Sequence, residues 1–340
     1  MKKIITFSVI LLTLISAFGC KTVKPLLPNV SGKAGEVVIV IEKTAWEGDL
    51  GIELRKILGG DCPYLAQKEP LFSIANVTPA GFTDMFKVHR NIIIMNINKK
   101  VENEGVIYRN NVWASTQCVM QINARDNAEA LNIFKENSER ITNTLEQAER
   151  DRIIANSKLY ENIQIAEVVK GIFGGSPHFP IGYVLKKQTE DFVWIANDKQ
   201  YSIQGVFLYK YPAAKNENFT VKNIIKHRNA FLEKNVPGMF DNTWMTTSNY
   251  ITPTVEFIRF RGRQFAQTRG FWEVHNDFMG GPFVSHSFYS PDGKDIIVAE
   301  AFVYAPKFDK RQYLREVESI IYSFEWDTTA NKSTKVKNKE

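Results

Sequence analysis

The sequence has few of the side chains that most often bind metals or act as nucleophiles. Its 340 residues include only three cysteines and five histidines. It contains no Cys-x-x-Cys pair, no His-Glu-x-x-His motif, no glycine-rich nucleotide-binding loop and no calcium-loop pattern. The sequence therefore offers no motif for a zinc finger, a dithiol oxidoreductase, a zinc protease or a nucleotide-dependent enzyme.

Positive charge is also scarce once it is located along the chain. The formal net charge is +6, but two of these charges belong to Lys2 and Lys3 and two more to residues 327–340. Residues 21–326 thus carry a net charge of only about +2, which is far from the basic surface of a nucleic-acid-binding protein. We predict no nucleic-acid partner.

The first twenty residues have the layout of an export signal. Lys2 and Lys3 precede an uncharged apolar stretch, residues 4–18, which is too short to span a bilayer comfortably. Gly19 followed by Cys20 resembles the lipobox of bacterial lipoproteins, although residues 17 and 18 are Ala and Phe where a lipobox more often has Leu and a small residue. The resemblance implies that Cys20 is lipidated and anchors the mature chain to a membrane. A secreted protein or an uncleaved anchor is the alternative.

The rest of the chain is long enough for two domains, since its roughly 320 residues are more than a single hydrophobic core usually holds. Residues 21–33 hold two prolines and no hydrophobic period, which predicts a tether. We predict an N-terminal domain over residues 34–175 and a C-terminal domain over residues 176–326, with the boundary at a glycine pair followed by two prolines. Residues 327–340 are predicted to be a disordered basic tail.

In the N-terminal half, strand and helix patterns alternate. The β-branched runs at residues 36–41 and 91–97 predict strands that are buried on both faces. Asp126 with Glu129 resembles a capping box and opens a long amphipathic pattern that runs to Arg152. Further strands are predicted at 71–77 and 112–122, and further helices at 46–58 and 163–173.

The C-terminal half is richer in strands. Alternating patterns at 255–265, 271–276, 284–289 and 296–304 predict an antiparallel meander, and three more strands are predicted at 181–187, 191–196 and 202–211. Apolar residues at helical spacing predict helices at 220–234 and 310–324. The fold class predicted for both domains is α+β, each with a mostly antiparallel or mixed sheet and packed helices.

Apart from Cys20, the chain has two cysteines, and an even pair in an oxidising compartment permits one disulfide. Cys62 lies in a Gly-Gly-Asp-Cys-Pro turn, whereas Cys118 lies in a predicted strand. Their spacing does not decide between a bridge and the alternative of one loop thiol and one buried thiol.

One segment has the side chains of a metal site. Glu273, His275 and Asp277 would share one face of an extended strand, and His286 on the next strand would add a second imidazole. A divalent metal is the one cofactor that this pattern suggests. Our prediction is instead that these residues form the solvated face of a half-exposed strand and that the protein has no cofactor, with the metal site as the alternative.

A neighbouring segment carries arginines at alternate positions. Arg259, Arg261 and Arg263 would lie on one face of a strand, with Arg269 just beyond. Guanidinium groups in such a row suit a carboxylate, sulfate or phosphate ligand. The alternatives are a bulge at Gly262 that breaks the alternation, and ordinary pairing with nearby acids.

Three segments together carry a resemblance to a known family. These are the first strand EVVIVI (36–41), the segment RGFWEV (269–274) and the closing helix YLREVESIIYSF (313–324). With the tether, they resemble a family of Bacteroides-type lipoproteins that is catalogued only as a domain of unknown function. The resemblance implies a Gram-negative setting and supplies no catalytic residues. Surface-exported lipoproteins of such bacteria tend to carry an acidic run after the lipidated cysteine, whereas the residues after Cys20 are KTVK. The resemblance therefore implies the inner leaflet of the outer membrane, facing the periplasm.

Taken together, these patterns predict a lipid-anchored periplasmic protein that works as a ligand-binding or envelope-assembly module. Its partners would be the membrane, through the lipid, and a small ligand, a glycan or an envelope protein. One alternative is a metal-dependent hydrolase built on Glu273, His275, Asp277 and His286. The other is a surface glycan-binding lipoprotein that stacks sugars on an exposed row of its tryptophans or tyrosines.

Overall fold

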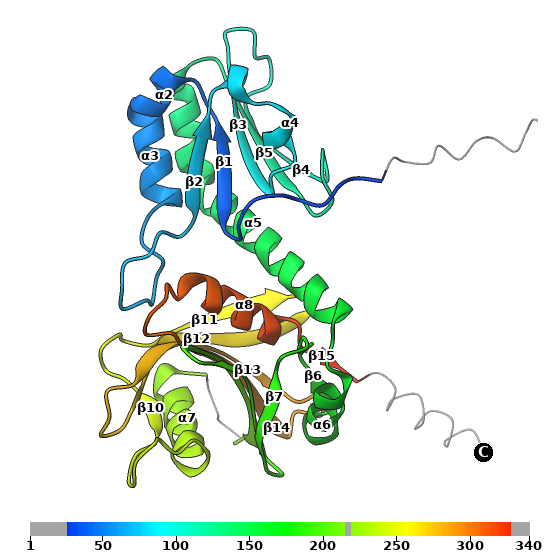
Figure 1. Ribbon diagram of the computed structural model, residues 1–340, viewed down its shortest axis with the longest axis vertical. Helices are drawn as coiled ribbons and strands as arrows, with labels where there is room; N and C mark the ends of the chain where they lie inside the picture. Colours follow the sequence, from blue (N-terminus) through cyan, green and yellow to red (C-terminus); the bar gives the residue numbers. More distant parts are fainter. Residues whose placement is uncertain (1–25, 215–218, 328–340) are drawn as a thin grey trace, which may run out of the picture.

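The computed structural model describes residues 26–214 and 219–327, which form two α+β domains stacked along the long axis of the molecule (Figure 1). The predicted signal peptide with Cys20, the start of the predicted tether and residues 328–340 of the predicted tail lie outside the described residues. Within the described ranges, no helix is both long enough and apolar enough to cross a membrane.

A five-stranded mixed sheet forms the centre of the N-terminal domain, in the order β2-β1-β3-β5-β4. Four strands are parallel, and the edge strand β4 is antiparallel to β5. The strands are β1 (Glu36–Val40), β2 (Ser73–Val77), β3 (Asn91–Ile97), β4 (Gly105–Asn110) and β5 (Cys118–Ala124). The chain is buried from Val37 to Ile41, as its unbroken apolar run requires of a strand covered on both faces.

Helices cover the two faces of this sheet unequally. One face packs against the apolar sides of α3 (Asp49–Leu58) and α5 (Asn127–Leu159). The other is covered by a smaller cluster around Phe82, Phe86 and Trp113, near η1 (Pro79–Gly81) and α4 (Asp84–Lys87). The short helix α2 (Lys43–Glu47) follows β1 and precedes α3.

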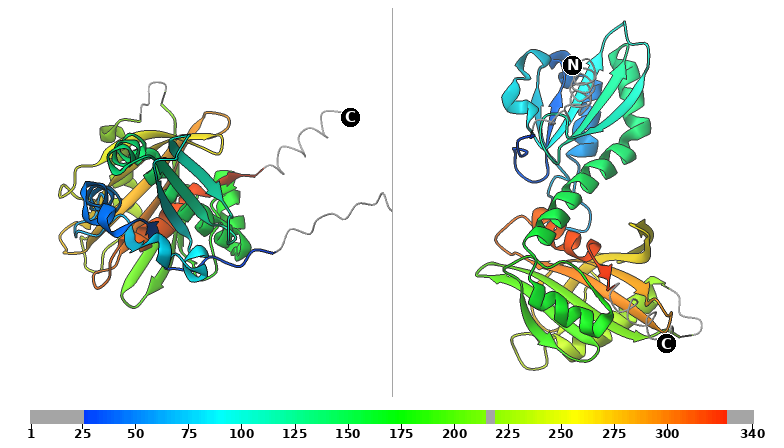
Figure 2. Two further views of the ribbon diagram at one scale, coloured as in Figure 1. Left: turned by 90° about the horizontal axis from the view of Figure 1, so that it is seen from above. Right: turned by 90° about the vertical axis from the view of Figure 1, so that its right-hand side faces the viewer.

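Helix α5 begins where the sequence predicts and connects the two domains (Figure 2). The Asp126 side chain caps it by accepting a 2.9 Å hydrogen bond from the Glu129 backbone N–H. Its first half contributes Phe134 and Ile141 to the N-terminal core. Its last turns contribute Ile154 to the C-terminal core.

An eight-stranded antiparallel sheet forms the C-terminal domain, in the order β10-β12-β13-β14-β9-β8-β7, with β11 also paired to β12. Its strands are β7 (Val184–Gln188), β8 (Phe192–Lys199), β9 (Ser202–Pro212), β10 (Met245–Thr247), β11 (Thr254–Phe260), β12 (Arg263–Val274), β13 (Gly280–Tyr289) and β14 (Asp295–Tyr304). A two-stranded ribbon of β6 (Gly175–Ser176) and β15 (Glu325–Trp326) lies beside it.

Helices lie on both faces of the C-terminal sheet. The end of α5, α6 (Ile163–Phe173) and α8 (Arg311–Tyr322) share one apolar cluster with the sheet. Helix α7 (Val221–Asn235) packs on the opposite face. The predicted α+β class and the division into two domains are confirmed.

The structure corrects three of the predicted elements. The predicted strand 255–265 is a hairpin, because Arg261 (φ 47°) and Gly262 (φ 83°) form a tight turn between β11 and β12. The predicted helix 46–58 is interrupted at Gly48, which has an extended backbone. Residues 112–117 of the predicted strand 112–122 lie in the loop between β4 and β5.

Candidate functional site: the cleft between the domains

A cleft of about 660 Å³ lies between the domains, where α5 passes over α8 and the β11–β12 hairpin. Charged side chains dominate its lining, which includes Arg150, Arg259, Arg269, Arg311, Arg315, Glu139, Glu146, Glu256 and Glu318. Aromatic rings contribute the apolar part: Tyr64, Phe260 and Tyr322. Tyr64 also joins the domains directly, because its hydroxyl lies 2.7 Å from that of Thr254 on β11.

Two ion pairs hold the walls of the cleft in place, and the carboxylate side chain of each is mostly buried. Arg315 on α8 binds Glu146 on α5 in a forked arrangement, with Nε–Oε2 and Nη2–Oε1 distances of 3.0 and 2.6 Å. Arg269 on β12 pairs with Glu318 on α8. Burial alone would lower the pKa of both guanidiniums, but the facing carboxylates outweigh it and raise the pKa. Both guanidiniums therefore stay ionised.

The three remaining arginines of the cleft have no carboxylate of their own, and the Arg311 side chain donates to the Pro70 carbonyl and the Ser73 hydroxyl. Arg150 stacks on the Tyr322 ring at 3.9 Å, and its distance to Glu318, which already pairs with Arg269, is 4.0 Å. Arg259 is exposed, and within the described residues its guanidinium makes no ion pair or hydrogen bond. These two groups leave positive charge available at the cleft surface.

Beneath the cleft lies a buried histidine that belongs to the core. His286 on β13 is fully buried and stacks on the Phe265 ring at a centroid distance of 4.0 Å. Its Nε2 lies 3.3 Å from the amide nitrogen of Gln267, which donates a 2.7 Å hydrogen bond to the Tyr322 hydroxyl. Burial lowers the pKa of His286 well below its usual value, and nearby arginines lower it further, so the imidazole is neutral.

The structure does not bring the predicted metal ligands together. Strand β12 ends at Val274, so His275 and Asp277 do not continue the alternation that Glu273 begins. His275 stacks on Trp244 instead, at 4.3 Å. His286 pairs across the sheet with Gln267, six residues or about 20 Å along β12 from Glu273. Among the described residues, no three His, Cys, Asp or Glu side chains form a group that could hold a metal ion.

The four predicted anion-binding arginines are divided by the turn at Gly262. Arg259 and Arg269 line the cleft. Arg261 lies in the turn and pairs with Asp151 at 2.9 Å. Arg263 donates to backbone carbonyls at the end of α8, including that of Phe324 at 3.2 Å. A single row of guanidiniums is therefore not formed, because the turn sends the chain back at the point where a continuous strand was predicted.

Cys62 and Cys118 are free in the structure. Cys62 lines the cleft, whereas Cys118 lies at the buried start of β5. Burial raises the pKa of each thiol to about 11, so neither is a thiolate near neutral pH.

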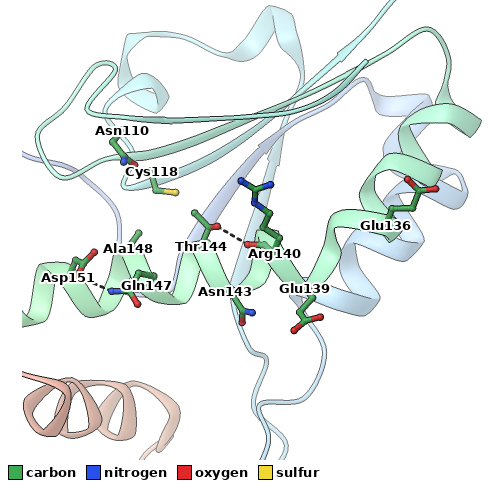
Figure 3. Close-up of a pocket in the computed structure, with 10 residues that line it drawn as sticks. All are labelled: Asn110, Cys118, Glu136, Glu139, Arg140, Asn143, Thr144, Gln147, Ala148 and Asp151. Atoms are coloured by element: carbon green, nitrogen blue, oxygen red, sulfur yellow. Dashed lines mark hydrogen bonds between the residues drawn. The ribbon is translucent and has the colours of Figure 1, made fainter. Parts of the chain in front are cut away.

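The cleft continues along α5 into a second hollow of about 530 Å³, with which it shares Glu139, Asn143 and Gln147 (Figure 3). Local hydrogen bonds fix part of its helical wall: the Thr144 hydroxyl donates to the Arg140 carbonyl at 2.7 Å, and Gln147 donates to Asp151 at 2.9 Å. This hollow gives the cleft a polar extension towards the N-terminal domain.

The tryptophans do not form an exposed sugar-stacking row. Trp272 is buried, and the other five are half-buried. Those five lie on separate segments, two in the N-terminal domain and three in the C-terminal domain. The tryptophan row considered for a surface glycan-binding protein is therefore absent.

Comparison with known proteins supports the two-domain division. Residues 30–158 match the model of a domain of unknown function (DUF8532), and residues 162–323 match that of another domain of unknown function (DUF4837). The resemblance to proteins catalogued only by domains of unknown function is thus confirmed, whereas the lipoprotein character stays a prediction. No curated protein matches the sequence.

Among solved structures, a crystal structure of a protein from Bacteroides thetaiotaomicron VPI-5482 is similar over 46% of this chain. The alignment spans 46% of that protein, about half its length, with 11% sequence identity and a TM-score of 0.27. A similarity of this size carries no argument about fold or function.

Proposed function

We propose that this protein is a lipid-anchored binding module of the bacterial envelope and that the cleft between its domains binds a small anionic ligand. The observation that carries the proposal is the pair of incompletely neutralised guanidiniums, Arg150 and Arg259, at the surface of this cleft. Junctions between domains are common places for ligand sites. The proposal requires no cofactor.

The chemistry of the cleft favours a carboxylate, sulfate or phosphate group. A guanidinium donates two parallel hydrogen bonds to such groups, and Arg150 is held in place by its stacking on Tyr322. The Arg315–Glu146 and Arg269–Glu318 pairs keep the walls in position without requiring the ligand. The aromatic rings would contact an apolar part of the ligand.

Two neighbouring arginines provide a matched test of ligand binding. Arg259 lines the cleft, whereas Arg261 is also exposed but pairs with Asp151 outside it. We would titrate the mature chain with phosphate, sulfate and citrate by calorimetry in low-salt buffer, and compare Arg259→Gln with Arg261→Gln. Arg259→Gln should weaken binding about three- to tenfold, corresponding to one charge-assisted contact, and Arg261→Gln should leave it unchanged. Equal affinities in both variants, or binding of none of the three anions, would refute an anion site in the cleft.

The proposed anchor is tested separately. We propose that Cys20 is acylated and that the protein lies on the periplasmic side of the outer membrane. Cells fed an alkyne-labelled fatty acid should label the wild-type protein and not Cys20→Ser, and external protease should spare the protein in intact cells. Absence of label on the wild type would refute the proposed lipid anchor but would not bear on ligand binding in the cleft.

A further inference from the structure

The N-terminal domain has its own hollow at the carboxyl edge of its parallel strands. The connection from β1 passes through α2 and α3 to β2, on one side of β1 in the sheet, whereas the chain leaves β3 in the other direction, past β5, to the edge strand β4. In open sheets with parallel strands, the crevice where two connections diverge in this way is the usual ligand site. A hollow of about 540 Å³ lies between the ends of β1 and β3, at the edge that faces away from the C-terminal domain (Figure 1).

The polar part of this hollow is already arranged by an amide cluster. The Asn123 Oδ1 atom accepts hydrogen bonds from Asn96 Nδ2 at 2.8 Å and from Gln121 Nε2 at 2.7 Å. Asn98 donates in turn to Asn96 Oδ1 at 3.0 Å. These bonds fix the orientation of the Asn96 and Gln121 amides, and within the described residues the Gln121 Oε1 atom keeps its acceptor capacity unused.

Three further lining side chains have unused hydrogen-bonding groups. Glu42 precedes α2 but its carboxylate does not cap that helix. Among the described contacts, the side chains of Glu42, Thr44 and Asn127 make no hydrogen bond or ion pair, and all three are exposed around the hollow. One carboxylate, one hydroxyl and amides therefore converge on this space.

The charge of the lining decides the class of ligand. No arginine, lysine or histidine lines the hollow, and Glu42 would repel an anion. Amides and a carboxylate donate to and accept from adjacent hydroxyl groups, while the remaining wall is aliphatic. We infer that this hollow is a second binding site and that it takes a neutral carbohydrate, whose hydroxyl groups bind Gln121, Asn96 and Glu42. The inference is independent of the anion site proposed for the cleft.

Saturation-transfer NMR on the full mature chain tests this site with glucose, galactose and N-acetylglucosamine as separate probes, up to about 20 mM, which covers weak binding with a Kd near 1 mM. At least one sugar should receive saturation. Gln121→Met, which keeps the side-chain volume, should weaken its binding about tenfold, and the exposed Glu42→Gln about threefold.

Two controls separate this site from the cleft and from misfolding. Gln147→Met makes the same chemical change on α5, and Arg259→Gln alters only the cleft, so both should bind the sugar as the wild type does. Because Glu42 lies on an exposed loop, its variant stays informative even if Gln121→Met unfolds. Saturation of none of the sugars, or an unchanged affinity in Glu42→Gln, would overturn the inference.

Discussion

The carboxylate of Glu69 accepts hydrogen bonds from the backbone N–H groups of Lys310 and Arg311, each at 2.7 Å. Glu69 belongs to the N-terminal domain, whereas Arg311 is the first residue of α8 in the C-terminal domain. Helix α8 has no side-chain cap of its own. One domain thus supplies the helix cap of the other, and Glu69 is only 3% exposed.

We expect Glu69→Ala to lower the free energy of unfolding by about 2 kcal/mol, because it removes a helix cap and leaves two covered N–H groups without an acceptor. Urea denaturation followed by circular dichroism measures the change. Glu256→Ala, at an exposed position in the cleft, is the control and should be nearly neutral. A Glu69 variant as stable as the control would mean that water satisfies these N–H groups.

The buried pair Arg228–Glu300 should be costly to break from one side. Both side chains are fully buried, with Nη2–Oε1 and Nε–Oε2 distances of 2.7 and 2.9 Å. Arg228→Met leaves the Glu300 carboxylate without its cation, and we expect a loss of about 3–5 kcal/mol in chemical denaturation. Adding Glu300→Leu should recover part of that loss. Additive losses in the double variant would show that the two charges are not coupled.

Acid should destabilise the protein through His286. Its pKa is lowered in the folded protein by burial, then by Arg263, Arg269 and Arg150, whereas in the unfolded chain it returns to about 6.5. Below pH 6.5 the unfolded chain therefore binds a proton that the folded protein does not. The free energy of unfolding, which is unaffected by His286 above that pH, then falls by about 1.4 kcal/mol per pH unit, or by about 2 kcal/mol at pH 5.

The measurement is a comparison of slopes. Unfolding free energies of the wild type and His286→Gln, determined between pH 7 and pH 5, should diverge because the variant lacks this proton uptake while keeping all other titrating groups. Parallel curves would show that His286 is protonated in the folded protein.

Cys62 and Cys118 should be present as slow-reacting thiols. With the pKa of each raised to about 11, about one thiol in a thousand is ionised at pH 8. Alkylation of the folded protein at pH 8 should thus be much slower than that of the urea-unfolded chain. The unfolded chain should show both thiols without added reductant, and a requirement for reductant would instead reveal a disulfide between Cys62 and Cys118.

Local patterns predicted the elements better than they predicted the sites. The strand at residues 91–97 and the helix at 163–173 have the predicted bounds, because an apolar run or stripe bounded by clear stop signals is determined locally. Strand β4 was not predicted, since the side chains of its sequence GVIYRN are only half-buried or exposed. The strand forms because its backbone pairs with β5. A bulge at Gly262 was considered as an alternative, but a turn was not, because Arg-Gly is a weak hairpin signal compared with Asn-Gly or Asp-Gly.

The cleft depends on contacts that no local pattern contains. Arg259 and Arg269 were predicted to bind an anion, but Arg150, Glu146 and Arg315 looked like ordinary charged residues beside apolar helical stripes. They form the site only because α5 passes over α8, and Glu146 and Arg315 are 169 residues apart in the sequence. The hollow in the N-terminal domain had a weak sequence signal, namely the asparagines that end the apolar strand at 91–97.

Helix α5 has 33 residues, which corresponds to a rod about 50 Å long. Its segment up to residue 158 falls within the N-terminal family match, yet Ile154 is packed into the opposite core. Separating the protein at the family boundary would give one fragment a projecting apolar end in water and the other an empty space in its interior. We therefore expect the two domains to unfold on heating in a single cooperative transition, because α5 is part of both hydrophobic cores.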